Sequence, residues 1–214
     1  MLRIENLYVS IGAIPIIRDA SLAMNEGEMC GLIGRNGAGK TTLLRALMGA
    51  LPARGKAELG HVDLLALPAH RRASQGIGYM PEDRRLIPDL TVEENVLVPA
   101  WAAGMPDAHA RLQKVYEYIP EVKQFAPRKG LQLSGGQQKL AALARALMCG
   151  TRLLLLDEPF EGVAPALAQR LAEVIAGLKR EGLSVLLSES DLQHSERLVD
   201  RVIAIDRGSI AAGQ

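Results

Sequence analysis

Residues 34–42 read GRNGAGKTT, and they stand between an apolar run at residues 29–33 and a helical pattern that stops at Gly49. This spacing and these flanking elements fit the phosphate-loop pattern. Small residues let backbone N–H groups surround phosphate oxygens, and the N-terminus of the following helix adds a favourable dipole. We expect Lys40 to neutralise the β- and γ-phosphates of a nucleotide and the Thr41 hydroxyl to ligate Mg²⁺. The predicted nucleotide-binding residues of this loop are Gly34, Arg35, Asn36, Gly37, Ala38, Gly39, Lys40, Thr41 and Thr42.

A second apolar run, LLLLDEP at residues 153–159, ends in two acidic residues. Four consecutive leucines predict a buried strand, and the ligands of open α/β sheets bind at the carboxyl ends of such strands. We expect Asp157 to hold Mg²⁺ through a water molecule and Glu158 to polarise the water that attacks the phosphate. The alternative is that Asp157 caps a helix and Glu158 is a solvated surface charge.

A third segment, LSGGQQ at residues 133–138, precedes a helical stripe of leucine and alanine. Ser134 and Gln137 have the spacing of a capping box. We expect the backbone N–H groups of Ser134, Gly135 and Gly136 to be free and to form an anion site. A well-capped helix without a ligand is the alternative, and the spacing alone leaves both open.

Strand-like and helical segments alternate along the chain. Four apolar runs have strand character: residues 29–33, 153–156, 183–187 and 202–205. Helical patterns lie between them, and one begins at Pro165 and ends with Lys179 and Arg180 before Gly182. The alternation predicts an α/β fold in which helices cover a mainly parallel sheet.

Helical patterns dominate the middle of the chain. Between residues 86 and 150 the strand signal fades, and breaks are expected at Pro99, Gly104 to Pro106, Pro120 and Pro127. We therefore expect an inserted helical subdomain at about residues 86–150. A length of 214 residues suits one domain with its own core, so a single domain over residues 1–214 is predicted.

Composition excludes several classes of function. A formal net charge of +1 and 3% aromatic residues offer neither a basic surface nor stacking platforms, so no nucleic-acid partner is expected. No apolar stretch approaches the ~20 residues of a membrane span. The N-terminus, with Arg3 and Glu5, lacks the apolar core of a secretory signal, which favours a cytoplasmic protein. Cys30 and Cys149 lie in apolar segments and are expected to be buried, reduced thiols.

The three segments in this order resemble ATPase subunits of the ATP-binding cassette (ABC) type, over essentially the whole chain. The resemblance implies an ABC-type nucleotide-binding domain with a small N-terminal antiparallel β part, and an ATP hydrolase that uses ATP and Mg²⁺. It also implies a head-to-tail dimer with a second ABC ATPase subunit, identical or related. In that family the loop at Ser134, Gly135, Gly136 and Gln137 binds the γ-phosphate of ATP held by the opposite subunit.

Two further stretches, residues 78–96 (GYMPEDRRLIPDLTVEENV) and residues 157–165 (DEPFEGVAP), resemble the branched-chain amino acid uptake branch, and more narrowly its second ATPase subunit. Glu82 stands where most of the superfamily has a glutamine that senses Mg²⁺ and contacts the permease. The resemblance therefore implies that Glu82 contributes to the metal and nucleotide site; a surface carboxylate is the alternative. It further implies two integral-membrane permease subunits, an extracytoplasmic solute-binding protein, and a peripheral location on the inner face of the cell membrane.

Other functions remain open. Short-chain amide and urea importers are close relatives of this branch, and an exporter or lipid-handling ATPase would use the same domain with a different permease. Soluble ABC proteins that act on ribosomes or DNA usually carry two cassettes or a long coiled-coil insertion, which this sequence lacks. A non-enzymatic regulator is disfavoured by the intact Lys40, Asp157 and Glu158.

The sequence departs from the family pattern at the switch histidine, whose place falls on Ser190. A serine hydroxyl can donate a hydrogen bond to phosphate, but it lacks the positive charge of imidazolium. We therefore expect Ser190 to act in catalysis at a lower rate. The alternative is that Ser190 starts a helix with Gln193 as its capping-box partner. His194 is expected to be a surface or packing residue.

Overall fold

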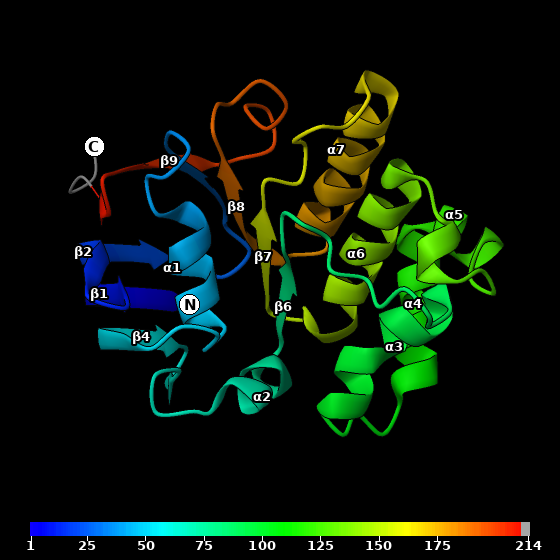
Figure 1. The fold of residues 1–214 in the computed structure, drawn as a ribbon, viewed down its shortest axis with the longest axis horizontal. Helices are drawn as coiled ribbons and strands as arrows, with labels where there is room; N and C mark the ends of the chain where they lie inside the picture. Colours follow the sequence, from blue (N-terminus) through cyan, green and yellow to red (C-terminus); the bar gives the residue numbers. More distant parts are fainter. Residues whose placement is uncertain (211–214) are drawn as a thin grey trace.

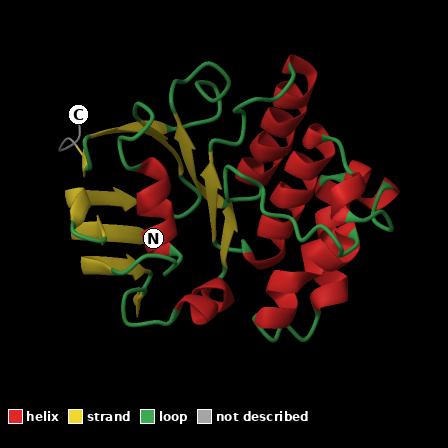
Figure 2. Cartoon of the chain, viewed as in Figure 1, coloured by secondary structure: helices red, strands yellow, loops and turns green. Residues whose placement is uncertain are grey.

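The computed structural model describes residues 1–210, and the last four residues of the predicted domain, 211–214, lie outside the described part. The chain forms two sheets and a set of helices beside them (Figures 1 and 2). The helices are α1 (Lys40–Leu47), α2 (Ala69–Arg72), α3 (Val92–Ala102), α4 (Ala108–Tyr118), α5 (Pro120–Gln124), α6 (Gly135–Cys149) and α7 (Pro165–Arg180), with short 3-10 turns at Ala73–Gln75 and Gly130–Gln132.

The larger sheet is mainly parallel, as predicted. Its order is β10 (Ser209–Ile210), β9 (Arg201–Asp206), β3 (Met29–Ile33), β8 (Ser184–Glu189), β7 (Leu153–Asp157) and β6 (Ile77–Met80). The pairs from β9 to β6 are parallel, and only the short edge pair of β10 with β9 is antiparallel. Every residue of β7 and β8 is buried, as expected for strands covered on both faces.

The smaller sheet is antiparallel and comes from the N-terminal part of the chain. Its order is β2 (Ile14–Met24), β1 (Leu2–Ile11), β4 (Ala53–Leu59) and β5 (Val62–Asp63). Strand β1 buries Leu2 and Ile4 before an irregularity at Asn6, and Leu7 and Val9 after it, which keeps one core face and one solvent face for this sheet. The predicted fold class, with an antiparallel N-terminal part, is confirmed.

Two hydrophobic cores meet at β7. Leu153 and Leu155 belong to the core shared with α1 and the antiparallel sheet, whereas Leu154 and Leu156 belong to the core shared with α3 to α7. Successive strand residues point to opposite faces, so one leucine run serves both cores. Strand β7 therefore holds its carboxyl end, Asp157, between the helix after the phosphate loop and the helical part of the molecule (Figure 1).

Several element ends follow the predicted signals. Helix α1 is followed by Gly49 in a left-handed conformation (φ 75°), and α7 begins at Pro165. The expected break at Pro99 is wrong, because Pro99 lies inside α3. The missing N–H costs one helical hydrogen bond, but the buried Val92, Val96 and Ala100 hold the helix in place.

Two further expectations concern thiols and membranes. Cys30 and Cys149 are buried and free, and burial raises the pKa of the Cys30 thiol to about 12. This confirms that the two thiols are buried, and neither forms a disulfide within residues 1–210. Within residues 1–210, no helix has both the length and the apolarity needed to cross a bilayer.

Candidate functional site

The phosphate loop connects β3 to α1 and leaves the start of α1 open. The residue before α1, Gly39, has φ 111°, and no side chain caps the helix. The N–H groups of the first turn therefore face the loop without a protein cap. A Cβ on Gly34 would lie 2.3 Å from the carbonyl oxygen of Ile205, so only glycine fits there. The loop borders a cavity of about 450 Å³ lined by Ile16, Asn36, Gly37, Gly39, Lys40, Thr41, Thr42, Glu82, Glu158 and Glu161.

Glu158 forms an ion pair with Lys40 inside this cavity. The distance from Lys40 Nζ to Glu158 Oε1 is 2.9 Å, and the two side chains are only 5% and 7% exposed. Glu158 has a left-handed backbone (φ 47°), a conformation that costs free energy in a residue with a Cβ. Its N–H donates to the carbonyl oxygen of Ser188 at 3.1 Å. The lysine predicted to bind phosphate thus holds the predicted general base.

Ser190 joins the same group of side chains. Its Oγ lies 3.0 Å from Glu158 Oε1, 2.8 Å from Asn36 Oδ1 and 3.4 Å from Lys40 Nζ. One hydroxyl proton serves only one acceptor at a time, so Ser190 divides its donation between Glu158 and Asn36. The structure therefore brings together the three residues predicted to be catalytic, namely Lys40, Glu158 and Ser190.

The alternative role of Ser190 as a helix cap is wrong. Residues 190–199 form bends and turns, and the N–H of Gln193 donates to Asp191 rather than to Ser190. Direct contacts with Lys40 and Glu158 hold Ser190 outside helical geometry. His194 is exposed, and its ring centroid lies 5.6 Å from that of Phe160, which fits the predicted packing role.

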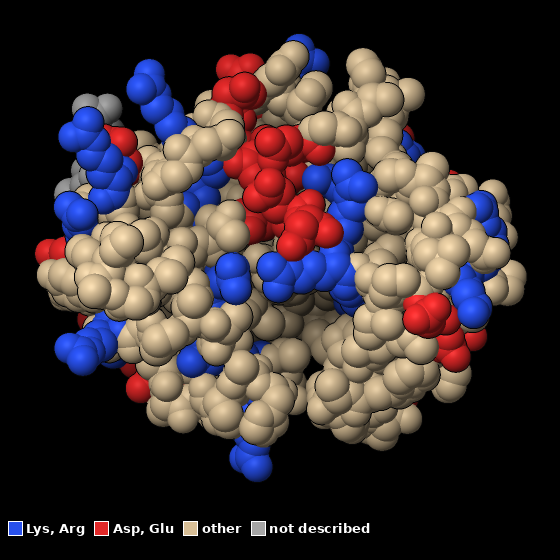
Figure 3. All heavy atoms as spheres, in the orientation of Figure 1, with Lys and Arg blue, Asp and Glu red and all other residues tan. Residues whose placement is uncertain are grey.

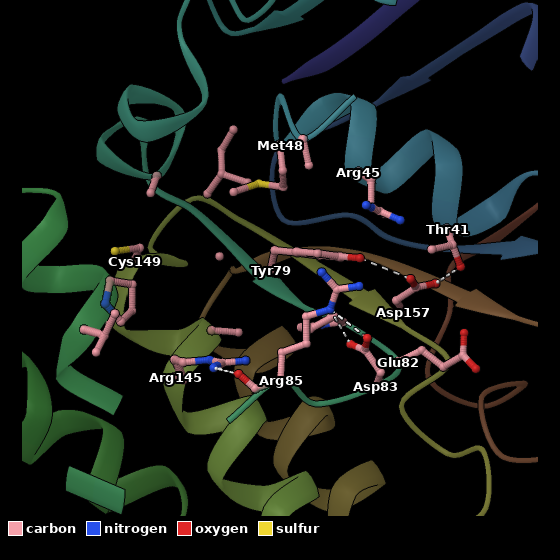
Figure 4. Close-up of a pocket in the computed structure, with 18 residues that line it drawn as sticks. Thr41, Arg45, Met48, Tyr79, Glu82, Asp83, Arg85, Arg145, Cys149 and Asp157 are labelled. Atoms are coloured by element: carbon pink, nitrogen blue, oxygen red, sulfur yellow. Dashed lines mark hydrogen bonds and ion pairs between the residues drawn. The ribbon is translucent and has the colours of Figure 1, made fainter. Parts of the chain in front are cut away.

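Asp157 and Thr41 lie together at the end of β7. Thr41 Oγ1 donates to Asp157 Oδ1 at 3.1 Å, and Ser188 Oγ donates to the same oxygen at 2.7 Å. The hydroxyl of Tyr79 donates to Oδ2 at 3.2 Å (Figure 4). Burial raises the pKa of Asp157, and the hydrogen bonds from Ser188, Thr41 and Tyr79 oppose that shift. A bound cation would favour the charged carboxylate further.

Glu82 lies at the rim of the cavity, close to three other acids. Burial raises its pKa, and the charges of Glu161, Asp157 and Glu158 add to the effect. Figure 3 shows acidic side chains gathered at the centre of this face, near the ends of the parallel strands. A polyphosphate bound among these acids requires a counter-cation.

The donor set fits Mg²⁺ if phosphates complete it. Carboxylate and hydroxyl oxygens are the ligands that Mg²⁺ takes, usually with substrate phosphates and water. Among residues 1–210 no group of three or more His, Cys, Asp or Glu forms a metal site by itself. Thr41, Asp157 and Glu82 supply one hydroxyl and two carboxylates. These residues can hold the ion only together with a nucleotide.

The LSGGQQ segment lies apart from this cavity. Ser134 Oγ accepts from the N–H of Gln137 at 3.3 Å, and Gln137 Oε1 accepts from the N–H of Ser134 at 3.1 Å, so the predicted capping box is present. The expectation of a free Ser134 N–H is therefore wrong, because the side chain of Gln137 occupies it. The first-turn amides of Gly135 and Gly136 have no intrahelical acceptor. None of these four residues lines the cavity at the phosphate loop.

Comparisons with known proteins identify the family. A family model described as "ABC transporter" matches residues 17–161. The chain belongs to the ABC transporter family. It is 36% identical to the high-affinity branched-chain amino acid transport ATP-binding protein BraG of Pseudomonas aeruginosa, over 98% of this chain and 91% of that protein. It is also 34% identical to the lipopolysaccharide export system ATP-binding protein LptB of Haemophilus influenzae, over 99% of this chain and 89% of that protein.

Solved structures agree with this assignment. A nucleotide-free ATP-binding cassette from an ABC transporter is 27% identical, with a TM-score of 0.85 over 100% of this chain and 92% of that one. The dimeric cassette MJ0796 shares the fold, with a TM-score of 0.88 at 24% identity over 100% of this chain and 98% of that one. The chain is therefore the ATP-binding, ATP-hydrolysing subunit of an ABC transporter.

Three residues that contact the site of this ABC ATPase were missed by sequence reasoning. Tyr79 and Ser188 hydrogen-bond to Asp157, and the buried Lys139 donates to the carbonyl oxygens of Glu158 (2.9 Å) and Glu161 (3.3 Å). Ser188 and Tyr79 end or interrupt apolar runs, so a polar residue near a strand's carboxyl end was the available signal. For Lys139 the signal was a cation directly before the apolar stripe of Leu140, Leu143 and Leu147.

Glu189 is a buried acid beside the catalytic group of this ABC ATPase. It is 7% exposed, and its Oε1 has no hydrogen-bond partner within residues 1–210. Its pKa is raised to about 8, mainly by burial and then by the charge of Glu158, while the N–H of Phe160 and the charge of Lys139 oppose the shift. Glu189 therefore stays protonated at neutral pH, which avoids a second buried negative charge.

Glu189→Gln should change how stability depends on pH. The unfolded carboxyl ionises near pH 4.5 and the folded one near 8, so the folded state binds more protons between these values. The free energy of unfolding of the natural chain therefore falls as pH rises through this window. Melting temperatures at pH 6 and pH 8.5 should show the variant gaining at least about 3 °C relative to the natural chain at the higher pH. Glu196→Gln, an exposed control, should show no such gain. An equal difference at both pH values would contradict the shifted pKa.

Proposed function

We propose that this chain is the ATPase subunit of an importer for branched-chain or other hydrophobic amino acids, peripheral on the inner face of the cell membrane. The observation that carries the proposal is the similarity to BraG over nearly the full length of both chains. The stretches at residues 78–96 and 157–165 support the same branch. The importer would contain a second ATPase subunit, two permease subunits and an extracytoplasmic solute-binding protein.

Catalysis would begin with a change of partner at Lys40. The ammonium leaves the carboxylate of Glu158 and binds the β- and γ-phosphates, and the N–H groups of residues 34–42 surround the phosphate oxygens. The released Glu158 accepts a proton from water as its oxygen attacks the γ-phosphorus and the bond to the bridging β–γ oxygen breaks, giving ADP and phosphate. Thr41 and Asp157 would hold Mg²⁺, with Glu82 nearby at the rim of the cavity, and the ion would neutralise phosphate charge.

The LSGGQQ segment would act on the nucleotide of the second subunit. Its first-turn amides carry the positive end of the dipole of α6, yet they do not line the chain's own cavity. An anion supplied by a second subunit satisfies them. Two ATP molecules between two subunits would then hold a closed dimer, and hydrolysis would open it.

A second cavity lies beside the nucleotide site. It has a volume of about 690 Å³ and is bounded by α1, β6, the segment after β6, α3 and α6. Arg45, Tyr79 and Arg145 border this space, and Glu82 and Asp157 lie at its end nearest the nucleotide site (Figure 4). We propose that a cytoplasmic segment of the permease with an apolar face and an acidic residue binds here, so that movement of Glu82 and Tyr79 is passed to it.

Replacing Ser190 by histidine should raise ATP turnover about tenfold, because a charged donor adds about 1.4 kcal/mol over a neutral one. Ser190 is exposed, so an imidazole fits without displacing the core. The gain should be larger at pH 6.5 than at pH 8.5, since the imidazolium form supplies it. Steady-state turnover measures both, with Ser190→Ala as the variant that lacks a donor. Unchanged turnover in Ser190→His would contradict the proposal that this site hydrolyses ATP slowly because it lacks a histidine.

The importer is tested by identifying what co-purifies with the tagged full chain from gently solubilised native membranes, and by measuring uptake of labelled leucine after the gene is deleted. Polytopic permeases with a second ATPase, together with lost leucine uptake, are expected. Retained leucine uptake with lost urea uptake would favour the amide and urea importers. Membrane subunits of a lipid exporter would favour the second candidate, which the 34% identity to LptB supports. A complex without membrane subunits would contradict transport.

A further inference from the structure

Lys139 is a fully buried cation in the helix that follows the LSGGQQ segment. It is 1% exposed and lies in the second turn of α6, where the neighbours Leu140 and Ala141 belong to the hydrophobic core. A buried ammonium is unfavourable unless its protons are bonded. Lys139 Nζ donates to the carbonyl oxygen of Glu158 at 2.9 Å and to that of Glu161 at 3.3 Å. The charge is therefore directed at the backbone of one loop.

That loop carries the proposed general base. The N–H of Glu158 is fixed by Ser188 on β8, its carbonyl oxygen by Lys139 on α6, and its carboxylate by Lys40 on α1. A left-handed backbone at a glutamate persists only where surrounding contacts enforce it. Loss of the Lys139 contacts would free the peptide to relax and would turn the carboxylate away from its place beside the phosphate loop.

The charged groups around Lys139 also bear on its role. Burial lowers the pKa of Lys139, the charge of Arg84 adds to this effect, and the nearby acids Glu161 and Glu82 oppose it. A methionine, unbranched and one atom shorter, would fill most of the same apolar space. Packing alone therefore does not require an ammonium here, and its hydrogen bonds go to the loop after β7.

Lys139 also connects the LSGGQQ segment with the loop that carries Glu158. Its Cα lies two residues after Gln137, so any displacement of the first turn of α6 carries its ammonium along. The same first turn presents the amides proposed to bind the nucleotide of the second subunit. Lys139 bridges from helix α6 to the loop that follows strand β7.

We propose that Lys139 is a positioning residue that ties the anion site at residues 134–137 to the orientation of the Glu158 carboxylate in the same chain. A site would then become fully active only when its own LSGGQQ segment is engaged by the nucleotide of the second subunit. The inference rests on the proposed role of Glu158.

The test is a double-mutant cycle in the full chain, within the membrane complex that co-purifies with it. Lys139→Met keeps an unbranched side chain, one atom shorter, and removes its charge and donors, whereas Lys139→Gln keeps a donor. Lys123→Met, an exposed lysine of the same helical region, is the control. Each is measured alone and with Glu158→Gln for turnover, ATP affinity, Hill coefficient for ATP and melting temperature.

Lys139→Met should lower turnover at least about tenfold, leave ATP affinity within about threefold and bring the Hill coefficient toward one. Lys139→Gln should recover part of the loss, and in the Glu158→Gln background Lys139→Met should cause no further loss. An equal fractional loss in both backgrounds, or a loss that follows a drop in melting temperature, would assign Lys139 a structural role only. Full turnover in Lys139→Met with an inactive Glu158→Gln would overturn this inference alone. Full turnover in Glu158→Gln would overturn the role of Glu158 and this inference with it.

Discussion

Glu158→Gln should lower ATP turnover by at least about 10²-fold, the contribution of a positioned general base. The amide has nearly the shape of the carboxylate, but it cannot accept the proton of the attacking water at neutral pH. Glu158 is the acid that the structure places beside Lys40 and Ser190 inside the cavity at the phosphate loop. Single-turnover hydrolysis of bound ATP is the measurement, since it excludes effects on product release.

The same variant should bind ATP more tightly than the natural chain. Glu158 pairs with Lys40 at 2.9 Å, so the phosphates of ATP compete with a carboxylate for the ammonium. Glutamine is a weaker competitor, and the loss of one negative charge also reduces repulsion of the phosphates. We expect affinity to rise about three- to tenfold and an ATP-dependent closed dimer to accumulate, seen by equilibrium binding and size-exclusion chromatography.

Glu161→Gln is the matched control for both effects. Glu161 lines the same cavity, and its replacement by glutamine removes the same charge. Unlike Glu158, Glu161 is exposed and forms no ion pair with Lys40. It should change ATP affinity slightly and leave single-turnover hydrolysis within about threefold. If Glu161→Gln lost as much turnover as Glu158→Gln, the general base would have to be sought elsewhere in the acidic cluster.

Local patterns were sufficient to predict the parallel sheet and the phosphate loop. Strand β3 matches the predicted residues 29–33, and β7 begins at the predicted Leu153. Such strands are buried on both faces and read as uninterrupted apolar runs. Their carboxyl ends then fix where Lys40, Thr41 and Asp157 meet. By contrast, the break predicted at Pro99 is wrong, because helix α3 continues through it. The packing of α3 against α6, which stabilises the helix there, cannot be predicted from the local sequence.

Contacts between distant residues limited the prediction of the site. Ser188 reaches Asp157 across two paired strands, and Lys139 reaches the loop after β7 from a helix, so neither contact follows from spacing along the chain. Ser190 could be a cap or a catalytic residue by sequence, and its contacts with Lys40 and Glu158 decide against the cap. The ion pair of Lys40 with Glu158 was not foreseen, because both residues were assigned only to the nucleotide-bound state.

Lys40→Met should abolish tight ATP binding and also weaken the nucleotide-free protein. Lys40 supplies the ammonium that pairs with the carboxylate of Glu158 in the described residues. Each charged hydrogen bond to phosphate contributes about 1.5–3 kcal/mol. We expect ATP affinity to fall at least about 10²-fold. The variant also leaves the carboxylate of Glu158 buried without its partner, which costs up to about 3–5 kcal/mol. The melting temperature without nucleotide should therefore fall by about 10 °C.

The double variant Lys40→Met with Glu158→Gln separates the two effects. Removing both charges eliminates the unpaired buried carboxylate, so most of the lost melting temperature should return, whereas ATP affinity should stay low because the phosphates still lack their cation. Thermal unfolding without nucleotide and equilibrium binding of ATP measure the two quantities independently. A double variant as unstable as Lys40→Met would show that the ion pair does not hold the empty site. Restored ATP binding would show that repulsion by Glu158, and not the missing ammonium, had prevented it.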